Sequence, residues 1–151
     1  MSPCGKRMKI EKTIEIPQPI EAVWAFIADG RNDPRWCDKV VSVDQTAGEG
    51  PGRDAGYRVI HRPVRLRKPK ELTVTVEAFE PPRRMRLREE DDDGIFDVTY
   101  ALESTGDGTR LTQHDEIDWK IPRFQRPIAR AMVSRDIERQ LSALKALLER
   151  D

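Results

Sequence analysis

The sequence predicts an α+β fold in which a curved antiparallel sheet is closed by a long C-terminal helix. Two observations predict it. Six or seven strand-like segments fill residues 40–119, and one amphipathic helical segment follows them to the end of the chain. Consecutive strands joined by tight turns form an antiparallel meander. A curved sheet covered by a single helix encloses a cavity, and cavities bind small molecules.

The composition is that of a single soluble domain. A chain of 151 residues can bury roughly two-thirds of its unfolded surface. Lys plus Arg and Asp plus Glu number 27 each, so the whole molecule is not attracted to nucleic acid or anionic lipid. No apolar run approaches the ~18 residues of a membrane span, and none follows residues 1–7 as in a signal peptide. We expect a flexible tail at 1–7, one domain at 8–151 and a cytoplasmic location.

The cysteines and acidic residues indicate neither a disulfide nor a metal site. Cys4 lies in the expected tail and Cys37 in a helical segment, where it fits as a small apolar residue. A Cys/His cluster with zinc-ligand spacing is absent, and the acidic run at 89–93 lacks the spacing of a calcium loop. We therefore predict no metal and no cofactor.

The first elements are a strand and two short helices. Residues 8–16 alternate apolar and polar side chains as a half-buried strand does, with Lys12 as the one mismatch. Pro19 suits the first turn of a helix, which Gly30 ends. A second short helix starts near Pro34, with Asn32 or Asp33 as its cap.

The middle of the chain predicts strands with one wet face each. Apolar and polar residues alternate in the segments 57–61, 72–76, 85–88, 96–102 and 111–119, after a β-rich start at 40–43. The turns at 91–94 and 106–108 contain the Asp and Gly residues typical of hairpin tips.

The terminal helix carries two apolar stripes. At about 100° per residue the two stripes point in roughly opposite directions. The first stripe is Phe124, Ile128 and Met132, and the second is Val133, Ile137, Leu141, Leu144 and Leu148. We expect the second stripe to cover the sheet and the first to face a cavity mouth or a partner. Pro127 either begins the helix or kinks it.

Several segments together resemble the START-related, Bet v 1-like (SRPBCC) superfamily, and within it the polyketide cyclase/dehydrase-like group. The resemblance covers nearly the whole chain. It is carried by Pro19 with Val23 and Trp24, by Asp33 to Trp36, by the hairpin at 106–112 and by the final helix from Ile137 to Leu148. It implies a helix-grip fold, with about seven strands around the helix and a cavity for a hydrophobic or aromatic ligand. It implies no particular reaction.

His61 and Tyr57 are the candidate catalytic residues. They share a strand face with Val59, so both can project into the cavity as acid-base groups for cyclisation or dehydration. The alternative, which we favour, is a histidine hydrogen-bonded at the sheet edge. Tyr100 is either a phenol in the pocket or a core aromatic residue, and His114 is expected at the surface.

The candidate ligand-binding residues come from the strands and from the terminal helix. They are Trp36, Tyr57, Val59, His61, Val74, Tyr100, Asp115, Trp119, Phe124, Ile128 and Met132. Trp36, Trp119 and Phe124 either stack on a ligand or pack under loops. Asp115 and Glu89 share faces with apolar residues, so either is a pocket carboxylate with a raised pKa or, as we favour, a solvated group at a strand end.

Basic residues dominate the polar face of the middle strands. They are Arg58, Arg62, Arg65, Arg67, Lys68, Lys70, Arg84, Arg86 and Arg88. Because no aromatic residues alternate with them, we interpret the face as a solvated convex surface with Arg–Glu pairs and not as a nucleic-acid site.

Three functions remain open. The sequence favours binding of a small hydrophobic or aromatic, polyketide- or lipid-like ligand. The alternatives are a cyclase or dehydratase, and an interaction protein that uses the basic face or the first helical stripe, including self-association as a homodimer. A nucleophilic mechanism is not indicated, since there is no GxSxG elbow and His61 and His114 are the only histidines.

Overall fold

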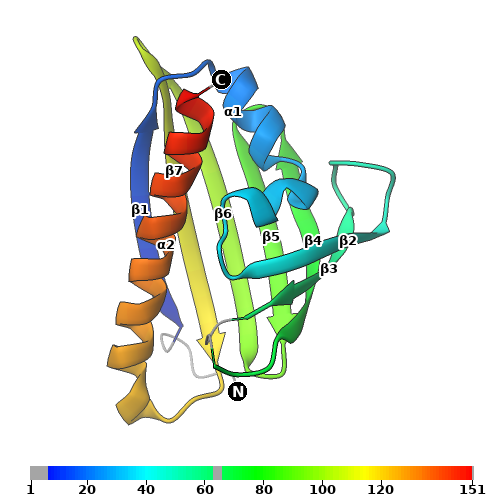
Figure 1. Ribbon diagram of the computed structural model, residues 1–151, viewed down its shortest axis with the longest axis vertical. Coiled ribbons are helices and arrows are strands. Elements are labelled where there is room, and N and C mark those ends of the chain that lie inside the picture. The colour runs from blue at the N-terminus through cyan, green and yellow to red at the C-terminus, as the bar shows by residue number, and fades with distance from the viewer. Residues whose placement is uncertain (1–6, 63–65, 151) are drawn as a thin grey trace.

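Seven antiparallel strands form one curved sheet in the order β1-β7-β6-β5-β4-β3-β2. The computed structural model describes residues 7–62 and 66–150. Its strands are β1 Met8–Ile16, β2 Val40–Ala47, β3 Gly56–His61, β4 Lys70–Glu80, β5 Arg84–Asp91, β6 Gly94–Thr105 and β7 Gly108–Trp119 (Figure 1). Cys4, Arg65 and all but Arg7 of the expected tail lie outside the described residues. Arg7 lies directly before β1, with its guanidinium 3.4 Å from Asp97.

Three short helical segments and one long helix complete the predicted helix-grip fold. The helices are α1 Ile20–Ile27, the 3₁₀ turns η1 Gly30–Arg35 and η2 Arg123–Gln125, and α2 Arg126–Glu149. Helix α2 runs along β1, on the opposite side of the molecule from β2 and β3 (Figure 1). No helix of the described residues is both long and apolar enough to cross a membrane.

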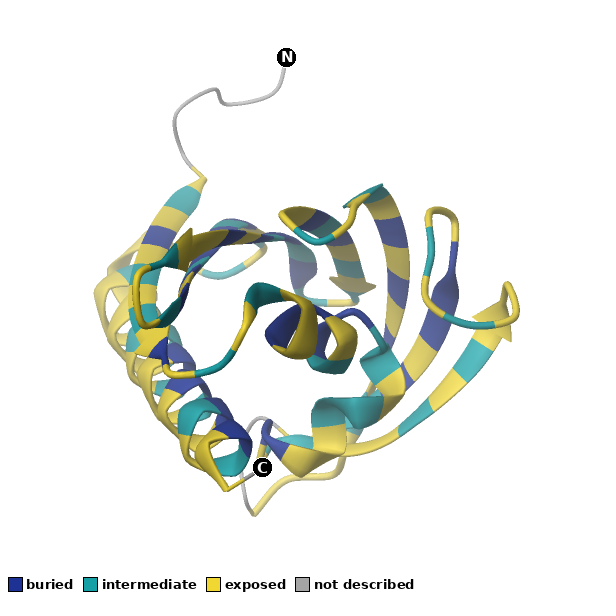
Figure 2. Ribbon diagram, turned by 90° about the horizontal axis from the view of Figure 1, so that it is seen from above, coloured by how far each residue is buried: buried dark blue, intermediate teal, exposed yellow. Residues whose placement is uncertain are grey.

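The strands alternate buried and exposed residues, as the sequence pattern predicts. Figure 2 shows this alternation as dark and light bands along the strands. In β7 the inward positions include Leu111 and Ile117, both 0% exposed. The turns fall at Asp92–Asp93 and Gly106–Asp107, as expected. Gly108 admits no other residue, because an added Cβ would lie 2.2 Å from the carbonyl oxygen of Ile16.

Helix α2 separates its two apolar stripes as expected. The stripe that faces the sheet is buried at Ile137, Leu141, Leu144 and Leu148, and Val133 is partly buried against the core. The other stripe is outside: Phe124 is 78%, Ile128 68% and Met132 48% exposed. Pro127 lies in the first turn of α2, so it begins the helix and does not kink it.

The polar face of the sheet is covered by ion pairs. They include Arg110–Glu15 at 2.9 Å, Arg84–Glu80 at 3.0 Å and Arg58–Asp44 at 3.4 Å. This is the solvated convex surface expected for the basic strand face. Lys12, the one charged residue at an apolar position in the alternation of β1, lies on the other side of that strand. It pairs with Glu138 of α2 at 2.6 Å, which explains the charge at this position.

Candidate functional site

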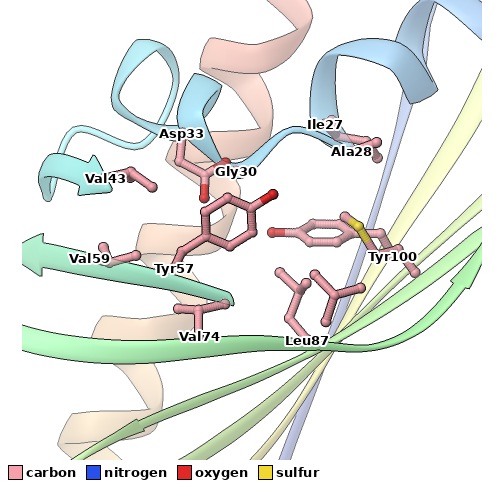
Figure 3. Close-up of a pocket in the computed structure, with 12 residues that line it drawn as sticks. Ile27, Ala28, Gly30, Asp33, Val43, Tyr57, Val59, Val74, Leu87 and Tyr100 are labelled. Carbon is pink, nitrogen blue, oxygen red and sulfur yellow. The ribbon is translucent and has the colours of Figure 1, made fainter. Parts of the chain in front are cut away.

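A cavity of about 210 Å³ lies between the sheet, the segment that joins η1 to β2, and α2. A smaller cavity of about 20 Å³ adjoins it under α1 and η1 (Figure 3). Asp33, Val59, Val74 and Tyr100 line both. The two cavities are therefore neighbouring compartments of one interior.

The larger cavity has an extensive apolar wall. Phe96 of β6 and Trp119 of β7 meet edge to face there, with ring centroids 5.6 Å apart. Val98 continues the wall on β6, and Val133 and Ile137 close it from α2. Such a surface favours an apolar or aromatic ligand.

Asp33 brings a carboxyl group into both cavities from η1. The sequence suggested it as a helix cap, but Asp29 caps η1 by accepting a hydrogen bond from the Arg31 amide. The backbone carbonyl of Asp33 accepts from the amides of Trp36 and Cys37, which holds the residue in place. Burial raises the pKa of the Asp33 carboxyl to about 7.

Glu89 and Asp115 are carboxyl groups of the larger cavity, so the favoured interpretation that they are solvated at strand ends is wrong. Each lies two residues from an inward apolar residue and so shares its face, Glu89 with Leu87 on β5 and Asp115 with Ile117 on β7. Burial raises the pKa of Glu89 to about 8, and the negative charges of Asp115, Asp33 and Asp91 add to that rise. Burial raises the pKa of Asp115 to about 6, against a hydrogen bond from Gln113 that lowers it.

Gln113 is a buried amide that sequence reasoning missed. It is 4% exposed and lines the larger cavity. Its Nε2 donates to Asp115 Oδ1 at 3.1 Å, while its Oε1 has no hydrogen-bond partner in the described part of the chain. The available signal was two polar residues at successive inward positions of β7, placed between the apolar inward residues Leu111 and Ile117.

His61 lines the larger cavity from β3. Its Nε2 lies 3.7 Å from Asp91 Oδ2, which is an ionic contact distance and too long for a hydrogen bond. Asp91 is fixed by accepting hydrogen bonds from the amides of Asp93 and Gly94. Burial lowers the pKa of His61, and the Asp91 carboxylate only partly opposes this. At neutral pH the imidazole is therefore neutral.

Tyr57 and His61 do not converge on one point. Tyr57 lines the smaller cavity, where Gly30 packs against its ring, whereas His61 lines the larger one. Four residues along β3 separate them by about 13 Å at roughly 3.3 Å per residue. The predicted acid-base pair is therefore divided between the two compartments. Tyr100 lines both cavities, and Figure 3 shows its hydroxyl and that of Tyr57 pointing toward the same region. Burial raises the pKa of both phenols.

The other predicted ligand-binding residues divide into three groups. Val59, Val74, Tyr100, Asp115 and Trp119 line the larger cavity with His61. Trp36 is 3% exposed and packs edge-on against Tyr100, with centroids 6.3 Å apart, behind the lining. Phe124, Ile128 and Met132 do not line it, contrary to expectation, because the opposite stripe of α2 faces inward.

Ion pairs join the start of β2 to α2 beside the larger cavity. Lys39 Nζ lies 2.6 Å from Asp136 Oδ2, and both residues line the cavity. Next to them Arg139 binds Asp38 at 2.9 Å and Asp136 at 2.9 Å. These salt bridges therefore hold α2 against the residues that precede β2 at this edge of the cavity.

The cavity also contains a free thiol, Cys37, whose pKa is raised well above its ordinary value by burial. It is therefore protonated and acts as a small apolar residue, as the sequence suggested. Within residues 7–62 and 66–150, no three His, Cys, Asp or Glu side chains are placed to hold a metal ion.

Residues 7–149 match the sequence family described as polyketide cyclase / dehydrase and lipid transport. The chain belongs to this family. The structure has the helix-grip fold that the resemblance implied, with seven antiparallel strands and a long C-terminal helix. Among proteins of curated function, none matches the chain.

Solved structures share the fold at low sequence identity. The protein TTHA0849 from Thermus thermophilus is 20% identical, with a TM-score of 0.78 over 93% of this chain and 97% of the other. The Zhui aromatase/cyclase from a Streptomyces species is 15% identical, with a TM-score of 0.80 over 95% and 94%. A START superfamily protein from Mycobacterium smegmatis is 15% identical, with a TM-score of 0.79 over 94% and 97%. At these identities the likeness concerns the fold alone.

Proposed function

We propose that the protein binds a small hydrophobic or aromatic molecule in the cavity between the sheet and α2. The observation that carries this proposal is a cavity of about 210 Å³ with an apolar wall and a few inward polar groups. Small-molecule sites combine these two features, since the apolar wall supplies affinity and the polar groups orient the ligand.

The size of the cavity limits the ligand. An apolar cavity of about 150 Å³ holds a benzene molecule. A cavity of about 210 Å³ therefore accommodates an apolar body of one or two rings. An extended polyketide or a whole lipid chain would need the cavity to widen, for example by separation of the Lys39–Asp136 pair.

A thermal-shift titration with 2-naphthol tests the binding function. A ligand that binds the folded state raises the melting temperature. We expect a rise in the natural protein, and loss of that rise in Val133→Trp, whose indole would fill the cavity from α2. The matched control is Met132→Trp, one residue away on the exposed stripe, which should keep the rise. A natural protein whose melting temperature stays constant, and which retains no small molecule in native mass spectrometry, contradicts the proposal.

A second candidate function is a cyclase- or dehydratase-type enzyme. The observation that favours it is the set of three carboxyl groups with pKa values of about 7, 8 and 6 in one cavity. Acid-base groups are most effective when their pKa lies near the working pH. In this proposal His61 works with Glu89 and Asp115, while Tyr57 reaches a substrate only through the smaller cavity.

Proton exchange in 1-tetralone, a two-ring ketone, tests the enzymatic candidate. Its α-protons exchange with D₂O only when a base removes them, which ¹H NMR follows directly. An enzyme of this kind accelerates the exchange, His61→Ala and Glu89→Gln each slow it by about tenfold or more, and Tyr57→Phe slows it less. Exchange no faster than in buffer excludes proton transfer to this class of ketone while leaving ligand binding intact.

A further inference from the structure

Three carboxyl groups reach the larger cavity from three different elements. Asp33 comes from η1, Glu89 from β5 and Asp115 from β7. They are close enough to influence one another, since the charges of Asp115 and Asp33 both act on Glu89. None of the three has an ion-pair partner within the described part of the chain.

Cations around the cavity do not balance these carboxyl groups. Lys39 is the one lysine or arginine among the described lining residues, and it already pairs with Asp136 at 2.6 Å. His61 is neutral because burial lowers its pKa. When the three carboxyl groups are ionised, the cavity therefore gains up to three negative charges that its own residues do not neutralise.

An unpartnered acceptor adds an independent observation. Gln113 is 4% exposed, and its Nε2 already donates to Asp115. Its Oε1 is buried and has no hydrogen-bond partner among the described residues, although Gln113 lines the cavity. A buried acceptor without a donor costs about 1–3 kcal/mol. A ligand that brings N–H donors would satisfy this oxygen and the carboxylates together.

We propose that the cavity selects a ligand with a cationic nitrogen, a protonated amine attached to an apolar body of one or two rings. This inference rests on the proposed binding function. The rings lie against the wall formed by Phe96 and Trp119, and the ammonium group lies among Glu89, Asp115 and Gln113. A cation stabilises the charged carboxylates, donates to Gln113 Oε1, and is attracted by neighbouring aromatic faces. A metal ion does not fit, since the carboxyl groups of the described residues do not converge on a metal-ligand geometry.

Three probes with the same ring system test the charge preference. They are 2-naphthylmethylamine, 2-naphthylmethanol and 2-naphthoate, which are cationic, neutral and anionic at pH 7.5. Calorimetric titration should give an affinity for the amine about tenfold or more above that for the alcohol, and the weakest binding for the naphthoate. Equal binding of amine and alcohol, or tightest binding of naphthoate, overturns this inference while the binding function stands. Failure of all three probes overturns both.

Two variants test whether Glu89 and Asp115 cause the preference for the amine over the alcohol. Glu89→Gln and Asp115→Asn should each reduce the ratio of amine to alcohol affinity by about threefold or more. The matched control is Glu90→Gln, the next residue on β5, whose side chain faces outward and is 53% exposed. It should leave the ratio unchanged. A ratio that is equally high in all four proteins means that the carboxyl groups do not select the cation and overturns the inference.

The dependence of the amine affinity on pH distinguishes a direct electrostatic role of the carboxyl groups from a purely structural one. Amine binding favours the ionised carboxylates, so the affinity should rise between pH 5 and 8, with release of protons measured in buffers of different ionisation enthalpy. The ionisable groups facing this site are Asp33, Cys37, Lys39, His61, Glu89, Asp91, Tyr100, Asp115 and Asp136. Protonation of His61 at low pH acts in the same direction, because it would repel the amine. An affinity that falls or stays constant over this range overturns the inference.

Discussion

Adjacent residues on β5 place their carboxyl groups in opposite environments. Glu90 faces outward, where its side chain is 53% exposed and lies 3.8 Å from the Arg88 guanidinium. Glu89 faces inward, where burial and neighbouring acids raise its pKa to about 8. On β7 the same contrast separates outward Glu116, 3.7 Å from Arg7, from inward Asp115. The face of the sheet, and not the residue type, decides whether a carboxyl group is a solvated ion or a titrating group of the cavity.

The largest effect should come from the apolar part of the inner face. Leu111 on β7 is 0% exposed. Leu111→Ala should lower the free energy of unfolding by about 2–5 kcal/mol, because it removes buried methyl groups and leaves a void. Thr112→Ala, on the outward side of the same strand, should cost less than about 1 kcal/mol. Chemical denaturation measures both, and equal losses would remove the distinction between the faces.

A smaller effect should come from Glu89, which should make the stability of the protein depend on pH, whereas Glu90 should not. The pKa of Glu89 is about 8 in the folded protein, against an ordinary value of 4.5. Between these values the folded state holds a proton that the unfolded chain has released, so stability falls as pH rises through this window. Asp33 and Asp115 act in the same direction, up to about pH 7 and 6.

Glu89→Gln should therefore flatten the decline in stability between pH 4.5 and 8 by on the order of 2 kcal/mol. In Glu90→Gln, stability should decline with rising pH as steeply as in the natural protein. Urea denaturation at several pH values measures both. An unchanged pH profile in the Glu89 variant would show that the pKa of this carboxyl group is not raised in the cavity.

Removal of the Tyr57 hydroxyl should have a still smaller effect. The hydroxyl is buried and has no hydrogen-bond partner in the described part of the molecule. Tyr57→Phe should change the free energy of unfolding by less than about 1 kcal/mol and can increase it, since no hydrogen bond is lost. A loss above about 2 kcal/mol would reveal a bound water or ligand on this oxygen.

The smallest effect on stability should come from the exposed stripe of α2. Ile128 is 68% exposed, so Ile128→Asp should change the free energy of unfolding by less than about 0.5 kcal/mol. The same variant tests the third function, an interaction surface. Sedimentation velocity showing a dimer in the natural protein and a monomer in Ile128→Asp would support self-association through this stripe. Identical sedimentation of the two proteins would exclude it.

Local patterns were sufficient to predict the fold. The alternation in residues 111–119 predicted β7, and Asp and Gly in the turns predicted the hairpins. The helical spacing of Ile137 to Leu148 predicted which side of α2 is buried. These patterns work because a strand or helix must present an apolar side to the core, and the periodicity of that side is visible in a short segment.

The candidate site was only partly predictable. His61, Tyr100 and Trp119 were identified because aromatic and imidazole side chains on an apolar strand face are conspicuous. Asp33 was interpreted as a helix cap and Gln113 was overlooked, because short polar residues have common local roles that a sequence window cannot distinguish from inward placement.

The sequence by itself determined the order of the elements, the buried side of each strand, and the family to which the chain belongs. Only the tertiary structure decided which polar groups share that cavity. Asp33, Glu89 and Asp115 are far apart in the chain, and their pKa values depend on burial and on one another's charges. Periodicity is a local property of the chain, whereas desolvation and electrostatic interaction depend on distances that exist only after folding.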